Sequence, residues 1–249
     1  MSPRWYRWVW LVGTALVGTH PAVADEVRVA VATNFTATMR ALVAEFETRT
    51  HHTVLLSFGS TGNQYAQIRN GAPFDAFFAA DAQRPELLER DGVAVAGSRF
   101  LYAVGRLALW SKRADYVDGD GQVLASGDYR HLAIANPELA PYGAAAREVL
   151  QARGLWDNLQ GRVVQGQDIG QAYSFVATGN AELGFVAYAQ IAKPGGDLEG
   201  SYWLVPESLH APIEQHAVLL RDVPAGREFL EFVKSAAART IIRSYGYGP

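Results

Sequence analysis

Hydrophobic residues follow two different periods between Val27 and Phe46. Valines alternate with other residues at the start of this stretch, which is the pattern of a buried strand. After Thr33 and Asn34, apolar residues recur with helical spacing, at Phe35, Met39, Leu42, Val43 and Phe46. The stretch therefore predicts a strand that turns into a helix packed on a sheet. The start of such a helix offers unpaired N–H groups and the positive end of a dipole, so an anion binds there without Lys or Arg.

The strand–turn–helix pattern occurs twice more along the chain. Thr53–Phe58 reads as a strand, and the turn around Ser60-Thr61 leads into a short helix that ends at Asn70-Gly71. Phe74–Ala79 reads as a third strand, after which Asp81 is placed to cap a helix. Three such units in succession predict a parallel sheet with right-handed crossovers.

A second α/β series follows, with a strand at His131–Ala135 and another at Gly184–Ala187. Its predicted helices are Gly143–Arg153 and Asp168–Thr178, and the chain closes with a predicted amphipathic helix over Ala225–Ala238.

Two long extended runs, Leu101–Trp110 and Ile213–Leu220, bracket the second series. We interpret them as crossings between two α/β lobes with a cleft between them, and a single large sheet is the alternative. The predicted division is residues 25–104 and 214–249 for lobe one, and 105–213 for lobe two.

Residues 1–24 have the pattern of a secretory signal peptide. Arg4 and Arg7 precede an apolar run, and Ala22-Val23-Ala24 offers a small-residue cleavage site. A membrane anchor is the alternative, but the run is shorter than the roughly 20 residues that a span needs. We therefore expect an exported protein of the bacterial periplasm.

Composition excludes several classes of function for the mature chain. Without Arg4 and Arg7, 20 of the 22 basic residues remain against 25 acidic ones, a formal charge of −5. With no basic cluster, we expect no nucleic-acid partner. The absence of cysteine excludes disulfides, thiolate metal sites and a cysteine nucleophile.

Enzyme signatures are weak. The sequence Phe58-Gly59-Ser60-Thr61-Gly62 lacks the glycine that a nucleophile elbow has two residues before its serine. Phosphate-loop and dinucleotide motifs are absent, and the histidines lack metal-ligand spacing. A hydrolase that uses Ser60 stays open as an alternative, as does a purely structural or receptor-partner role.

Four polar or special turns stand at predicted helix starts. Thr33-Asn34 and Ser60-Thr61 belong to lobe one, and Pro141-Tyr142-Gly143 and Asp168-Ile169-Gly170 belong to lobe two. Each alone has the composition of an ordinary helix cap. Together, facing one cleft, they predict a pocket of hydroxyls, an amide and N–H groups, which suits a small oxyanion that only accepts hydrogen bonds.

These residues give the chain a family resemblance from Asp25 to Pro249. The motifs are Ala32-Thr33-Asn34-Phe35, Ser57-Phe58-Gly59-Ser60-Thr61-Gly62, Gln67-Ile68-Arg69-Asn70-Gly71-Ala72-Pro73-Phe74-Asp75, Ala135-Asn136-Pro137-Glu138, Ala140-Pro141-Tyr142-Gly143 and Gly184-Phe185-Val186-Ala187. The chain resembles the periplasmic molybdate-binding proteins of ABC importers, a branch of the type II periplasmic binding proteins. The resemblance implies a two-lobed α/β fold of this type, in which each lobe is a mainly parallel sheet flanked by helices and two crossover strands join the lobes.

The resemblance also implies the site and the partners. The expected contacts to molybdate are Thr33, Asn34, Ser60, Thr61, Tyr142 and Ile169. The metal atom would be met only through the oxygens of this anion, and neither a cofactor nor catalysis is expected. The expected partners are molybdate or tungstate and the permease of an importer, with the protein a monomer. Another oxyanion such as sulfate is the alternative ligand.

The chain departs from the family pattern in two places. Many relatives have Ala-Ser-Leu where this chain has Thr33-Asn34-Phe35. Some relatives also place a ligand-binding tyrosine where this chain has Ala187, with Tyr188 one residue later. We expect Tyr142 to supply that contact and Tyr188 to face away.

Overall fold

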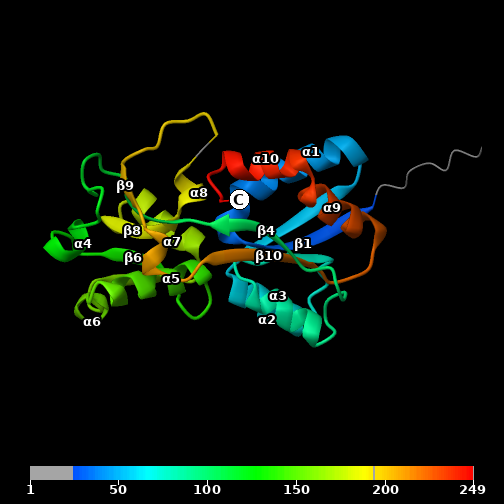
Figure 1. Ribbon diagram of the computed structural model, residues 1–249, viewed down its shortest axis with the longest axis horizontal. Coiled ribbons are helices and arrows are strands. Elements are labelled where there is room, and N and C mark those ends of the chain that lie inside the picture. The colour runs from blue at the N-terminus through cyan, green and yellow to red at the C-terminus, as the bar shows by residue number, and fades with distance from the viewer. Residues whose placement is uncertain (1–24, 193, 249) are drawn as a thin grey trace, which may run out of the picture.

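The computed structural model describes residues 25–192 and 194–248, which form two five-stranded sheets with helices on both faces. The two sheets lie in separate halves of an elongated molecule (Figure 1). The predicted signal peptide, residues 1–24, lies outside the described residues. In the part of the chain that is described, no helix has the length and apolarity needed to cross a membrane.

The first sheet has the strand order β2-β1-β3-β10-β4. These strands are β1 (Glu26–Ala32), β2 (Thr53–Gly59), β3 (Ala76–Phe78), β4 (Phe100–Gly105) and β10 (Ile213–Leu219). Strand β1 pairs in parallel with β2 and β3, whereas β10 is antiparallel to its neighbours β3 and β4. Because β10 lies between strands from the start of the chain, the last segment completes the first lobe.

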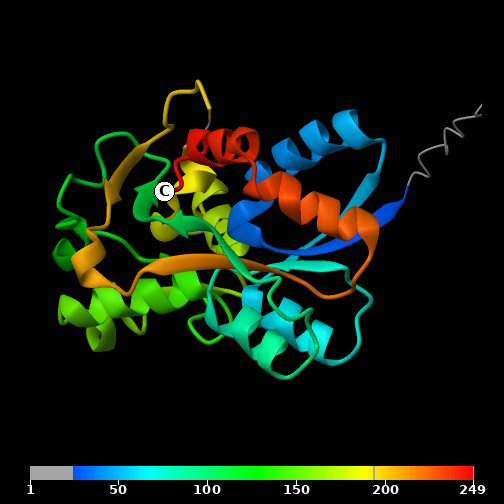
Figure 2. The same ribbon diagram turned by 45° about the vertical axis from the view of Figure 1, so that its right-hand side comes forward.

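Helices cover both faces of the first sheet (Figure 2). One face carries α1 (Thr36–Thr50), α9 (Pro224–Lys234) and α10 (Ala236–Ser244), and the short 3-10 helix η1 (Thr33–Phe35) leads into α1. The other face carries α2 (Thr61–Arg69) and α3 (Gln83–Arg90). Phe46 of α1 packs edge-on against Phe229 of α9, with ring centroids 5.0 Å apart. Phe229 also packs edge-on against Phe78 of β3, with ring centroids 5.9 Å apart, and this contact attaches α9 to the sheet.

The second sheet has the order β7-β6-β8-β5-β9. Its strands are β5 (Leu107–Ser111), β6 (Leu132–Ala135), β7 (Val163–Gly166), β8 (Leu183–Ala187) and β9 (Ser201–Leu204). Strand β6 is parallel to β7 and β8, and β5 is antiparallel to β8 and β9. The helical segments of this half are α4 (Val123–Ser126), α5 (Pro141–Ala152), α6 (Trp156–Leu159), α7 (Ile169–Ala177), α8 (Tyr188–Ile191) and η2 (Glu207–Leu209).

Two sequence predictions differ from the structure. The run Leu101–Trp110 is not one strand, because it divides at Arg106 into β4 of the first sheet and β5 of the second. The closing helix Ala225–Ala238 is two helices, because the Ser235 side chain accepts a hydrogen bond from the Ala238 N–H and starts α10. The α/β architecture is confirmed, while the predicted lobe boundaries stay a prediction.

Candidate functional site

The four predicted turns each follow the carboxyl end of a parallel strand. Thr33-Asn34 follows β1 and Ser60-Thr61 follows β2, while the start of α5 follows β6 and the start of α7 follows β7. Parallel strands that share a direction deliver these turns to one edge of each sheet. Each turn also begins a helical segment, so its first N–H groups have no partner inside the helix.

Hydrogen bonds bring turns of the two sheets together. The Gly170 N–H, in the first turn of α7, lies 3.4 Å from the Thr33 Oγ1. The Gly62 N–H, in the first turn of α2, donates to the Leu139 carbonyl, 2.8 Å away, just before α5 begins. The cleft is therefore closed at these two points, and residues far apart in the sequence form one site.

The site contains four hydroxyl groups, and all four accept a hydrogen bond from an N–H of the protein. The donor–acceptor pairs are Gly170 N to Thr33 Oγ1, Asn63 N to Ser60 Oγ, Ala80 N to Thr61 Oγ1 and Gln215 Nε2 to Tyr142 Oη. Within the described residues none of these hydroxyls donates to a protein acceptor. Because a hydroxyl both accepts and donates, each retains a proton for a ligand.

Burial and helix capping fix these groups. Ser60, Thr61, Tyr142 and Ile169 are each at most 3% exposed. Ser60 caps α2, and the Asp168 carboxylate caps α7 by accepting from the Gln171 N–H. The Gly170 N–H donates to the Thr33 hydroxyl, and the Ile169 N–H, the first of α7, has no partner inside the helix.

Asn34 lies in the site, but its side-chain amide is already engaged. Its Nδ2 donates to Gln215 Oε1 at 2.8 Å and to Tyr247 Oη at 3.2 Å. The two amide hydrogens are therefore used within the protein. The group that Asn34 can offer a ligand is its main-chain N–H, at the start of η1.

Tyr188 does not belong to this cluster. Its ring lies under the Arg106 guanidinium and against Tyr202, and a β-carbon on Gly246 would come within 2.7 Å of it. It forms part of the packing between α8 and the end of the chain. Tyr142 is the tyrosine that the structure places among the predicted site residues.

Burial keeps the phenols at the site neutral. It raises the pKa of Tyr142 and of Tyr102 well above the usual value near 10, and the pKa of Tyr247 is raised for the same reason. Since a desolvated phenolate is unfavourable, Tyr142 keeps its proton at neutral pH and can act as a donor.

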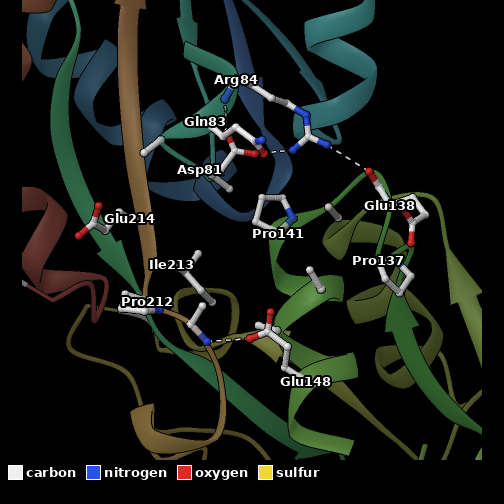
Figure 3. A pocket seen from close by; sticks show the side chains of 16 residues that line it. Asp81, Gln83, Arg84, Pro137, Glu138, Pro141, Glu148, Pro212, Ile213 and Glu214 are labelled. Carbon is white, nitrogen blue, oxygen red and sulfur yellow. Dashed lines mark hydrogen bonds and ion pairs between the residues drawn. The ribbon is translucent and has the colours of Figure 1, made fainter. Parts of the chain in front are cut away.

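A pocket of about 570 Å³ lies beside one of the four turns, where Pro141 at the start of α5 is among its lining residues (Figure 3). Arg84 lies between Asp81 of its own lobe and the Glu138 carbonyl of the other, which its Nη2 approaches to 3.1 Å. Four carboxylates line this pocket, from Asp81, Glu138, Glu148 and Glu214, against the single guanidinium of Arg84. This excess of negative charge makes the pocket unsuitable for an anion. Among the described residues, no three His, Asp or Glu side chains are grouped to hold a metal cation.

Among residues 25–192 and 194–248, no general base is hydrogen-bonded to the Ser60 hydroxyl. Its Oγ accepts only the N–H of Asn63. The hydrogen bonds of the described histidines go elsewhere: His52 contacts Glu228, and His216 contacts Arg99. This geometry does not favour the hydrolase alternative, which requires a base within hydrogen-bond reach of the nucleophile.

Sequence reasoning missed Gln215 and Tyr247. Gln215 is fully buried in β10, where Ile213 and Ala217 are its buried alternate neighbours. A polar residue in the buried phase of a strand is an available signal, since it must find hydrogen-bond partners. Tyr247 follows the last helix, and no local pattern distinguishes it.

Comparisons with known proteins agree with this architecture. The family model described as "Bacterial extracellular solute-binding protein" matches residues 27–248. The molybdate-binding protein ModA of Azotobacter vinelandii is 51% identical over 251 residues, covering 100% of this chain and 99% of that protein. Its counterpart in Rhodobacter capsulatus is 49% identical over 230 residues, covering 91% and 90%.

Two solved structures have a fold similar to that of this chain. The periplasmic molybdate-binding protein of Azotobacter vinelandii superposes with a TM-score of 0.87 at 44% identity, covering 90% of this chain and 99% of that one. The sulfate-binding protein SubI of Mycobacterium tuberculosis superposes with a TM-score of 0.75 at 12% identity, covering 90% and 87%. At that low identity the second match shows the fold alone.

Proposed function

Because this chain belongs to the bacterial extracellular solute-binding proteins, we propose that it captures molybdate between its two lobes and delivers the anion to the permease of an ABC importer. The observation that carries this proposal is the set of four hydroxyls that all accept a hydrogen bond from the protein, three of them buried, at Ser60, Thr61 and Tyr142. Each hydroxyl keeps its proton free to donate, so the site suits a ligand whose oxygens accept hydrogen bonds.

Helix N-terminal N–H groups supply the remaining donors. Thr33, Ser60, Thr61 and Tyr142 bind through hydroxyls, and Asn34 and Ile169 bind through main-chain N–H groups. A fully deprotonated tetrahedral dianion satisfies such donors without a neighbouring cation, because helix starts carry partial positive charge. High identity to two proteins named molybdate-binding selects molybdate among such anions.

Selectivity rests on the size of the cavity. Sulfate has the same charge and shape as molybdate but is smaller, so donors placed for molybdate leave sulfate with stretched hydrogen bonds. Tungstate is nearly the same size as molybdate and is accepted as well. Protonated oxyanions are disfavoured because their O–H group finds no acceptor among donors.

The protein acts in the periplasm as a monomer. The periplasmic relative of known structure and the predicted signal peptide support this location. Closure of the lobes over the anion presents both lobes together to the permease, since the ligand contacts the two lobes at once only in the closed state. The related proteins are named for binding rather than for catalysis, which supports a role without chemistry.

Calorimetric titration of the mature protein with molybdate, tungstate and sulfate at matched ionic strength tests the proposal. We expect one-to-one binding of molybdate and tungstate, with sulfate at least about a hundredfold weaker. If only sulfate binds, the protein would instead be assigned to an importer of another anion. If no heat of binding is measured with any of the three anions, the four turns are ordinary helix caps and the proposal is refuted.

A further inference from the structure

Gln215 connects the two lobes at the floor of the candidate site. It is fully buried in β10. Its Oε1 lies 2.8 Å from Asn34 Nδ2 and 3.0 Å from the Tyr102 hydroxyl, while its Nε2 lies 3.0 Å from the Tyr142 hydroxyl. One side chain thus joins a site residue of lobe one to a site residue of lobe two.

The orientation of this amide follows from Tyr247. The Tyr247 hydroxyl lies 2.9 Å from the Asn34 carbonyl, and a carbonyl only accepts, so Tyr247 must donate there. Its oxygen is then the acceptor for the Asn34 side chain, which must present its NH₂ group to Tyr247 and Gln215. Gln215 therefore turns its Oε1 toward Asn34 and its Nε2 toward Tyr142.

The direction of the Tyr142 proton follows in turn. Since Gln215 Nε2 donates to the Tyr142 oxygen, the hydroxyl proton points away from Gln215. On another side of the hydroxyl stands Gly105, so close that a β-carbon there would lie 2.3 Å from Tyr142 Oη and 2.6 Å from Gln215 Nε2. Among the described residues, the Tyr142 hydroxyl donates to no protein acceptor. The proton is left for a ligand oxygen.

We propose that Gln215 is a positioning residue that fixes Tyr142 as a hydrogen-bond donor to the bound oxyanion. The inference rests on the proposed function, because it assigns the Tyr142 hydroxyl to the anion. Without this amide the hydroxyl is free to rotate, and its lone pairs repel an anion oxygen whenever they face it. Gln215 raises affinity by excluding that orientation, and this contribution requires the Tyr142 hydroxyl.

A double-mutant cycle with molybdate isolates this indirect effect. Gln215→Met keeps the length of the side chain but removes both polar atoms, and Tyr142→Phe removes the hydroxyl through which Gln215 acts. We expect Gln215→Met to weaken molybdate binding about tenfold or more in the wild-type background. In the Tyr142→Phe background the same change costs at most about twofold. Equal losses in both backgrounds would overturn the inference.

A second variant, Gln215→Glu, makes the affinity for molybdate depend on pH, which a purely structural role of Gln215 would not do. When protonated, the carboxyl of Gln215→Glu donates to Tyr142 and accepts from Asn34, which reproduces the native pattern. When ionised, it only accepts and draws the Tyr142 proton away from the anion. The ionisable groups around this position are Tyr102, Tyr142 and Tyr247, which stay neutral, and Asp81.

We expect the affinity of Gln215→Glu for molybdate to recover as the pH falls from about 8 to about 6, because burial raises the pKa of a carboxyl. Charge repulsion alone would give the same recovery in the Tyr142→Phe background, and that result would count against the inference. A recovery that is largest when Tyr142 is present supports it.

Neutron diffraction from the deuterated protein locates the protons without any ligand. Deuterium on Gln215 Nε2 directed at Tyr142 Oη is expected, and deuterium on Tyr142 directed at Gln215 would overturn the inference. If the wild type does not bind molybdate, the proposed function is refuted. The neutron map still tests the direction of the hydrogen bond between Gln215 and Tyr142. The two failures are therefore distinguishable.

Discussion

Removal of one site hydroxyl at constant shape, by Thr61→Val, has calculable consequences. Thr61 is 1% exposed, and its Oγ1 accepts the N–H of Ala80 at 3.0 Å. Valine fills the same volume but leaves that N–H without an acceptor. An unpaired buried donor costs about 1–3 kcal/mol, so we expect the free energy of unfolding to fall by that amount.

The loss of affinity has a separate origin. The Thr61 proton has no acceptor within the described protein, and in the proposed complex it would donate to an anion oxygen. A hydrogen bond to a charged group contributes about 1.5–3 kcal/mol, so the dissociation constant for molybdate should rise roughly 10- to 150-fold. Loss of stability alone leaves the affinity of the folded protein unchanged.

Calorimetric titration and thermal unfolding, each on the same preparations, separate the two effects. Thr61→Ser is the matched control, because it keeps the hydroxyl and loses only a methyl group. We expect its molybdate affinity to stay within about threefold of wild type. A folded Thr61→Val protein whose molybdate titration superimposes on that of wild type would refute the assignment of this hydroxyl to the ligand.

Three further predictions concern stability away from the ligand. Asp75→Ala removes a buried carboxylate that accepts from the Arg28 N–H, and should lower the free energy of unfolding in urea by about 2–3 kcal/mol with molybdate affinity unchanged. Ser235→Ala removes the cap of α10 and should lower the free energy of unfolding by about 1 kcal/mol in the same assay. An unchanged free energy of unfolding would mean that the cap is dispensable. Burial and the Arg99 guanidinium lower the pKa of His216, so the unfolded chain takes up its proton first as the pH falls. Stability should therefore decline below about pH 6.5, and His216→Gln should make that decline shallower.

The sequence was most informative where hydrophobic periodicity decides the structure. The strand at Thr53–Phe58 and the helix at Asp168–Thr178 lie within a residue of β2 and α7, because buried strands and one-sided helices carry strong periodic patterns. The prediction of a single closing helix was wrong, because the apolar spacing continues through Ser235 into Ala236. A cap can interrupt a helix without interrupting that spacing, so periodicity alone does not detect the break.

The candidate site was only partly accessible from the sequence, for a different reason. Helix-start turns are local, so Thr61 and Ile169 could be chosen from composition and spacing. The partner of Asn34 is 181 positions away, in β10, and no local pattern pairs two such residues. Sequence therefore identified Asn34 as polar at a helix start, but not that Gln215 and Tyr247 occupy its amide hydrogens.

Binding and closure are linked by the direction of the site's hydrogen bonds. In the closed arrangement, Thr61 and Tyr142 are each 1% exposed, and among the described residues their hydroxyl protons have no acceptor. Water can satisfy these protons when the cleft is open, whereas closure without an acceptor leaves them unpaired at a cost in free energy. In the proposed complex, an oxyanion would remove that cost and add charge-assisted hydrogen bonds from both lobes. The anion thus stabilises the closed form more than the open one, and this difference is what couples capture of the ligand to the conformation that a permease would recognise.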